Sequence, residues 1–198
     1  MSTTTITLWN EKLEDLAKRW AEEPRSEDDP GFSAKELVSR VRSRLRIIQN
    51  YNRVPSRLEL NSRRQWEQVW HSEAIERDLR AAAKRLGWGV YVAPQGPPSP
   101  IELAAAGVQG NAILLDMAAA GQRAQALREA GLNRIWTKEH AMLQMLAEEI
   151  FHLTAERIGN RSAYRVVEEA ALGQFVQESL GLPFNPWALR FAQRAGGV

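Results

Sequence analysis

The spacing of apolar residues along the chain predicts a protein built mainly from helices. Between residues 8 and 23, four large apolar side chains are separated by four, three and four positions: Trp9, Leu13, Leu16 and Trp20. This spacing places them on one face of a helix, because an α-helix turns by about 100° per residue. Similar spacing, together with capping residues and glycine stops, predicts further helices: 34–49, 62–86, 100–106, 138–158, 163–180 and 186–195.

The segment 33–50 combines two patterns that indicate different structures. Its arginines stand at every second position from 40 to 46, as they would on one face of a strand. Ser33 and Glu36, however, form a capping-box signature, which is typical of the start of a helix. The apolar residues that follow keep the helical period: Leu37, Val38, Val41, Leu45 and Ile48. The capping box and the length of this apolar stripe favour a helix.

On that helix the four arginines flank the apolar stripe on two sides. Arg40 and Arg44 lie on one side of the stripe, and Arg42 and Arg46 lie on the other. Their aliphatic stems can cover the margins of the stripe while the charged groups stay in water. We therefore expect all four guanidinium groups to be exposed.

A small β element is predicted in the middle of the chain. The run WGVYVA at 88–93 is rich in aromatic and β-branched residues, as strands are. Residues 112–116 form either a buried strand that a helix follows from about 118, or the first turns of one alanine-rich helix over 111–131. Residues 132–136 are a third candidate strand. The predicted fold is mainly α, a multi-helix bundle with this minor β element, and the alternative is a three-layer α+β or α/β domain.

Charge is distributed unevenly along the chain, although the net charge is only +2. Residues 1–32 carry a net charge of −4 and residues 33–64 a net charge of +7. We therefore divide the chain into an acidic N-terminal helix and loop, 1–32, and a single mostly helical domain, 33–198, with an optional boundary near 94–99. The asymmetry indicates an anionic partner for the basic segment, unless the acidic segment masks it within the fold.

Several classes of protein are disfavoured by what the sequence lacks. It has no cysteine, which excludes disulfides and thiolate metal sites. It contains no phosphate-loop, nucleophile-elbow or HExxH motif. Its first residues do not resemble a secretory signal, and its longest apolar run is too short to span a bilayer. We expect a cytoplasmic protein that has no membrane partner.

The basic segment is the first candidate site. Arginine offers paired donors to phosphate, and an exposed aromatic side chain can stack on a base. The residues that we expect to contact nucleic acid are Arg40, Arg42, Arg44, Arg46, Arg63, Arg64 and Trp66. The four-residue spacing of Trp66 and Trp70 fits core packing as well.

The second candidate is a metal site on the two long helices near the C-terminus. Glu149 and His152 have the Glu-x-x-His spacing that places a carboxylate and an imidazole on one helix face. In an antiparallel hairpin, Glu168 or Glu169 would come to the same level. The helical wheel opposes this site, because it turns His152 away from the buried arc. No cofactor is expected unless this site holds a divalent metal.

These patterns predict a non-enzymatic helical subunit that belongs to an oligomer or a larger complex. It would contact nucleic acid or an acidic protein surface through its arginine-rich helix. The alternatives are a metal-dependent hydrolytic enzyme at the carboxylate–histidine site, and a pure protein–protein interaction module. Asp116 is the third candidate site, since an acid at the C-terminal end of a strand is a common catalytic position.

Overall fold

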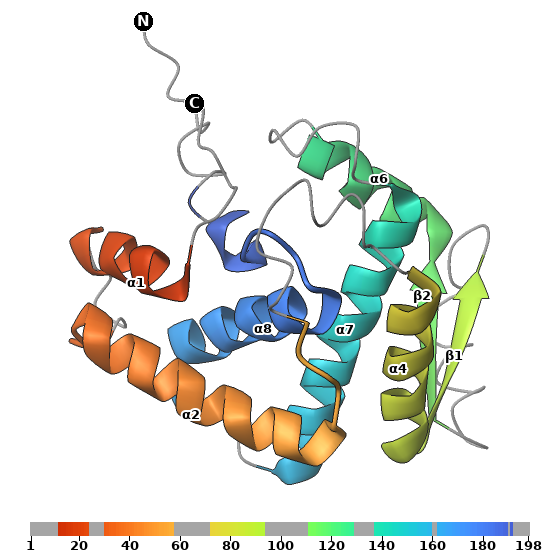
Figure 1. Cartoon of the computed structure of the whole chain (residues 1–198), viewed down its shortest axis with the longest axis horizontal. Coiled ribbons are helices and arrows are strands. Elements are labelled where there is room, and N and C mark those ends of the chain that lie inside the picture. The colour runs from red at the N-terminus through yellow and green to blue at the C-terminus, as the bar shows by residue number, and fades with distance from the viewer. Residues whose placement is uncertain are drawn as a thin grey trace, which may run out of the picture.

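The computed structural model describes residues 12–23, 30–57, 72–93, 111–128, 137–159, 162–189 and 191. Within these residues the chain forms six α-helices, one short 3-10 helix and a two-stranded sheet, which confirms the mainly α fold with a minor β element. In chain order the elements are α1 (Leu13–Glu22), α2 (Ala34–Asn52), α4 (Ser72–Arg85), β1 (Trp88–Ala93), β2 (Asn111–Asp116), α6 (Met117–Leu127), α7 (Lys138–Ile158), α8 (Arg165–Leu180) and η4 (Pro186–Ala188). Helix α1 and the sheet lie at opposite ends of the molecule (Figure 1).

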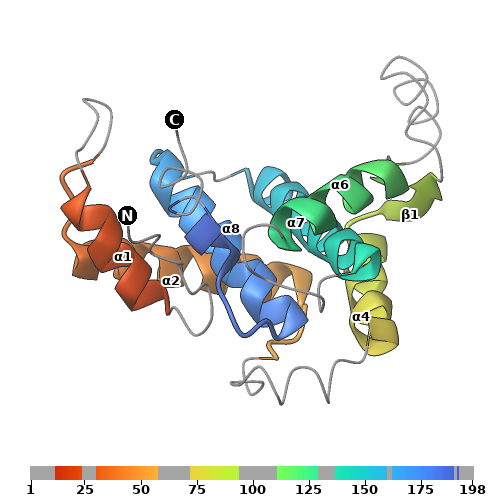
Figure 2. The same ribbon diagram turned by 90° about the horizontal axis from the view of Figure 1, so that it is seen from above.

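Three helices, α2, α7 and α8, form the centre of the fold. Helix α1 packs against α2, η4 packs against α8, and α4 and α6 pack against α7 (Figure 1, Figure 2). Buried apolar side chains from α1 join the same core cluster as those of the central helices, among them Leu16, Trp20, Leu37, Ile48, Phe151 and Phe175. The acidic N-terminal helix therefore packs against the rest of the protein and shares its hydrophobic core. Residues 94–99, where an optional boundary was expected, lie outside the described residues.

Helix α2 begins where the capping box predicted. The Ser33 hydroxyl accepts a hydrogen bond from the Glu36 amide, and the Glu36 carboxylate accepts one from the Ser33 amide at 2.8 Å. The hydrogen bonds from the amide and the hydroxyl of Ser33 lower the pKa of Glu36 below its usual value. The predicted apolar stripe is buried, and the helix continues to Asn52.

Strands β1 and β2 pair in parallel, with Trp88 opposite Asn111 and Ala93 opposite Asp116. Of the two alternatives for 111–131, a strand followed by a helix is therefore correct. The Asp116 side chain accepts a hydrogen bond from the Ala118 amide at 2.7 Å, so this carboxylate caps the start of α6. The helix expected over 100–106 and the strand expected over 132–136 lie outside the described residues.

The C-terminal helices end at the glycines that the sequence indicated. Gly159 and Gly181 follow α7 and α8 with φ angles of 67° and 66°, in the left-handed region that glycine adopts without a steric penalty. The next element also starts as predicted, because the Asn185 side chain accepts a hydrogen bond from the Trp187 amide at 2.9 Å. The two glycines set the C-terminal ends of these helices, while α8 begins at Arg165 without a side-chain cap.

Candidate functional site

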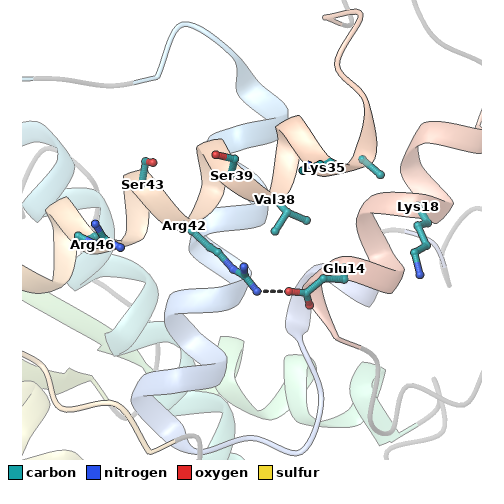
Figure 3. A pocket seen from close by; sticks show the side chains of 9 residues that line it. Glu14, Lys18, Lys35, Val38, Ser39, Arg42, Ser43 and Arg46 are labelled. Atoms are coloured by element: carbon teal, nitrogen blue, oxygen red, sulfur yellow. Dashed lines mark hydrogen bonds and ion pairs between the residues drawn. The ribbon is translucent and has the colours of Figure 1, made fainter.

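A groove of about 630 Å³ lies between α1 and α2 (Figure 3). We call it the basic groove, and its lining residues are Glu14, Lys18, Ala34, Lys35, Val38, Ser39, Arg42, Ser43 and Arg46. Four of these side chains are cationic and one is a carboxylate, so the lining has a net charge of +3. Two serine hydroxyls add neutral hydrogen-bond donors. This combination suits a ligand that presents negatively charged oxygen atoms.

Four of the lining residues form a row along α2. Lys35, Ser39, Arg42 and Arg46 are separated by four, three and four positions, which places them on one stripe of the helix. The row is about 16 Å long, because an α-helix rises by 1.5 Å per residue. Lys35 and Arg46 are exposed and form no ion pair within the described part of the chain. Their charges are therefore available to a ligand.

A carboxylate on α1 binds the arginine in the middle of this row and would compete with an anionic ligand for it. The Glu14 carboxylate accepts a hydrogen bond from the Arg42 guanidinium across the groove (Figure 3). The two side chains are 43% and 65% exposed, respectively. An ion pair this exposed contributes about 0–1 kcal/mol. The acidic segment therefore masks one arginine of the row, and it does so weakly enough for an incoming anion to replace the carboxylate.

The two arginines on the other side of α2 each contact another part of the chain. Arg40 is exposed, but its guanidinium carbon lies 4.2 Å from the ring centre of Phe32 and 5.6 Å from that of Tyr164. Arg44 is only 6% exposed, with its Nε 2.9 Å from Oε1 of Glu168. The expectation that all four guanidinium groups stand in solvent is thus wrong for Arg44, because α8 packs over this side of α2.

The four residues proposed as metal ligands are not brought together. Glu149 and His152 are exposed on α7, as the helical wheel predicted. On α8, Glu168 is engaged by Arg44 and by the Ser162 amide, while Glu169 accepts a hydrogen bond from Nε of Arg165 at 2.6 Å. Within the residues that the structure describes, no three histidine, aspartate, glutamate or cysteine side chains are placed to share a metal ion.

Three predicted nucleic-acid contacts, Arg63, Arg64 and Trp66, lie outside the described residues. Sequence reasoning also left out the other four side chains of the basic groove that can donate hydrogen bonds, namely Lys18, Lys35, Ser39 and Ser43. For three of them a signal exists, since their spacing from Arg42 and Arg46 puts them on the same side of α2. Nothing in the sequence places Lys18 there, because its position depends on how α1 packs.

None of the helices in the described part of the chain combines the length and the apolar character that a bilayer crossing requires. Comparisons with protein-family models, with curated proteins and with solved structures identify no match for this chain.

Proposed function

We propose that this chain is a non-enzymatic binding subunit whose basic groove takes the phosphate backbone of nucleic acid. The observation that carries the proposal is the composition of the groove, in which four cations and two hydroxyls face one weakly paired carboxylate. Phosphate oxygens accept hydrogen bonds from all of these donors, and arginine offers them in pairs.

Binding would rest on the neutralisation of phosphates. Each phosphate that a lysine or arginine neutralises releases a counterion, so the logarithm of affinity falls with the logarithm of salt by about 0.9 per contact on duplex DNA. With Lys18, Lys35 and Arg46 as contacts, affinity should drop roughly 40-fold between about 50 and 200 mM salt. The residues that line the groove include no aromatic ring and no amide side chain. Sequence preference should therefore be weak.

An acidic protein surface is the competing partner, and the groove fits it less well. Anchoring positions in protein–protein interfaces are enriched in tryptophan, tyrosine and arginine that fill desolvated pockets. The apolar side chains in the groove are small, Ala34 and Val38, and three of its four cations follow one line along α2. A line of charges matches a polymer of phosphates better than a compact patch of carboxylates.

The test compares two double variants that remove the same charge. Lys35→Gln with Arg46→Gln removes the two unpaired cations of the row on α2, while Arg77→Gln with Lys84→Gln removes one arginine and one lysine from the exposed surface of α4. Binding of labelled single- and double-stranded DNA and RNA is measured by fluorescence anisotropy at several salt concentrations. We expect the first variant to bind more weakly and to lose about 1.8 from the salt slope on duplex DNA, at about 0.9 per cation.

The control variant should bind with nearly the wild-type affinity and the wild-type salt slope. Only the small effect of its lower total charge should remain. Equal losses in both variants would show that only net charge matters, and absent or salt-insensitive binding of the wild type would favour the acidic protein partner. Circular dichroism of each variant confirms that the fold is intact. Unfolding of the row variant would mean that Lys35 and Arg46 act inside the fold.

A further inference from the structure

A second pocket, of about 310 Å³, lies between α2 and the start of α8, on the side of α2 that carries Arg40 and Arg44. We call it the serine–arginine pocket, and its lining residues are Ser39, Arg40, Ser43, Arg44, Ile47, Ser162 and Val167. Its polar side chains are two guanidinium groups and three hydroxyls. No carboxylate or amide side chain is part of this lining, so guanidinium and hydroxyl donors dominate the pocket.

Arg44 is the buried member of this set. Its Nε faces Oε1 of Glu168 in an ion pair, yet the geometry does not satisfy a hydrogen bond. Its Nη2 is also buried and donates to no acceptor in the described part of the chain. A buried guanidinium donor without an acceptor is costly. Neither atom is in contact with solvent, so a turn of the Arg44 side chain toward an anion in the pocket would relieve this cost.

The three hydroxyls have donor capacity as well. Neither Ser39 nor Ser43 hydrogen-bonds through its side chain to another described residue. The Ser162 hydroxyl accepts a hydrogen bond from the Tyr164 amide at 3.2 Å, which leaves its own hydrogen available. The Thr154 hydroxyl contrasts with them, because it donates to the Ile150 carbonyl of its own helix at 2.6 Å.

We propose that the serine–arginine pocket binds a phosphate group. Two guanidinium groups and three hydroxyls provide more donors than one carboxylate can use, whereas the four oxygens of a tetrahedral phosphate can accept from several of them at once. The volume falls at the small end of the range for ligand pockets, about 300–1,000 Å³. Carboxylates outside the lining balance its two guanidinium groups, Glu168 beside Arg44 and Glu36 near Arg40, so hydrogen-bond donors and not a net charge favour the phosphate. This site goes beyond the proposed function, because its cations, Arg40 and Arg44, are not those of the basic groove, although Ser39 and Ser43 border both pockets.

The test is calorimetric titration of the full chain with inorganic phosphate, in buffer whose ionic strength is held constant with chloride. Ser162→Ala removes one donor, and Arg44→Lys keeps the charge beside Glu168 while losing the paired donors. Each should weaken binding roughly tenfold, as loss of a hydrogen bond to a charged group does. Ser56→Ala, which changes an exposed serine elsewhere, should leave phosphate binding unchanged.

A second arm identifies the source of the phosphate. If the pocket takes the end of a nucleic acid, a 5′-phosphorylated oligonucleotide binds the wild type more tightly than its 5′-hydroxyl twin, and Ser162→Ala abolishes the difference. If it takes a free phosphate, only the inorganic titration responds to Ser162→Ala. Absence of saturable phosphate binding together with no preference for the 5′-phosphate overturns the proposal. The proposal is also wrong if Ser162→Ala changes neither the preference for the 5′-phosphate nor the affinity for inorganic phosphate. This outcome can be read even if Arg44→Lys fails to fold.

Discussion

Replacing Glu14 with glutamine should strengthen the binding of nucleic acid to the basic groove. Glu14 is the carboxylate in the lining of that groove, and it accepts a hydrogen bond from Arg42. Neutralising it raises the net charge of the lining from +3 to +4 and releases Arg42 to contact a phosphate. Because both side chains are well exposed, the lost ion pair should lower the free energy of unfolding by no more than about 1 kcal/mol.

The size of the gain follows from counterion release. One additional phosphate contact changes the slope of log affinity against log salt by about −0.9 on duplex DNA. If affinity extrapolated to 1 M salt is unchanged, the variant binds about eight times more tightly than the wild type at 0.1 M salt. That factor corresponds to about 1.2 kcal/mol of binding free energy. A salt series resolves it, since affinity and slope must change together.

Fluorescence anisotropy of a labelled duplex at four or more salt concentrations measures both quantities. Glu149→Gln serves as the matched control, because it removes one exposed carboxylate from α7 outside the basic groove. The control should shift affinity slightly and leave the slope as it is. If Glu14→Gln binds no more tightly than Glu149→Gln, or if its slope equals that of the wild type, Arg42 does not contact phosphate and the proposed docking site is wrong.

Two further predictions concern stability. Replacing Gly173 with alanine should lower the free energy of unfolding by about 1–3 kcal/mol, because the added Cβ would lie 2.6 Å from Oδ1 of Asn185 and 2.8 Å from the backbone nitrogen of Trp187. Gly121→Ala, which meets only the flexible end of a lysine side chain, should be neutral or stabilising by up to about 1 kcal/mol; equal stabilities of the two variants in urea would contradict the close approach at Gly173. Burial lowers the pKa of His140 to about 4, well below the usual value of about 6.5. The unfolded chain therefore binds a proton that the native protein does not, and stability should fall as the pH drops from about 6.5 to about 4. Urea denaturation across this window should give a flatter profile for His140→Gln, and coincident profiles would assign the pH dependence to other groups.

Local signals in the sequence identified most of the elements that the structure describes. The Ser33–Glu36 capping box fixed the start of α2 against a competing strand pattern, because it satisfies amides that only a helix end leaves unpaired. In the region 111–131, local signals could not decide between a strand and a helix. Its apolar run fits a buried strand and a helix equally well, and the hydrogen bonds that decide the matter come from β1, which precedes it by the segment 94–110.

For the candidate site, the sequence located the basic segment. It did not predict which guanidinium groups pair with carboxylates and which stay in solvent. Periodicity correctly separated Arg40 and Arg44 from Arg42 and Arg46. It did not reveal that α8 brings Glu168 against Arg44, or that α1 forms the opposite wall of the groove. Both facts depend on contacts between helices that are distant in the chain, and the helical period carries no information about such contacts.

The two-residue spacing of the arginines explains how one helix serves both the fold and a ligand. A step of two residues turns a helix by about 200°, so successive arginines alternate between its two sides. On one side, loss of Arg44 would leave the Glu168 carboxylate without its cation. For a buried ion pair, such a loss lowers the free energy of unfolding by about 3–5 kcal/mol. The effect here should be smaller, since the glutamate side chain is 21% exposed. On the other side, Arg46 forms no ion pair with a described residue, and the ion-pair partner of Arg42 is the exposed carboxylate of Glu14. Neutralising the second side should therefore alter ligand binding with little change in stability, which is the property that distinguishes a binding surface from an internal ion-pair network.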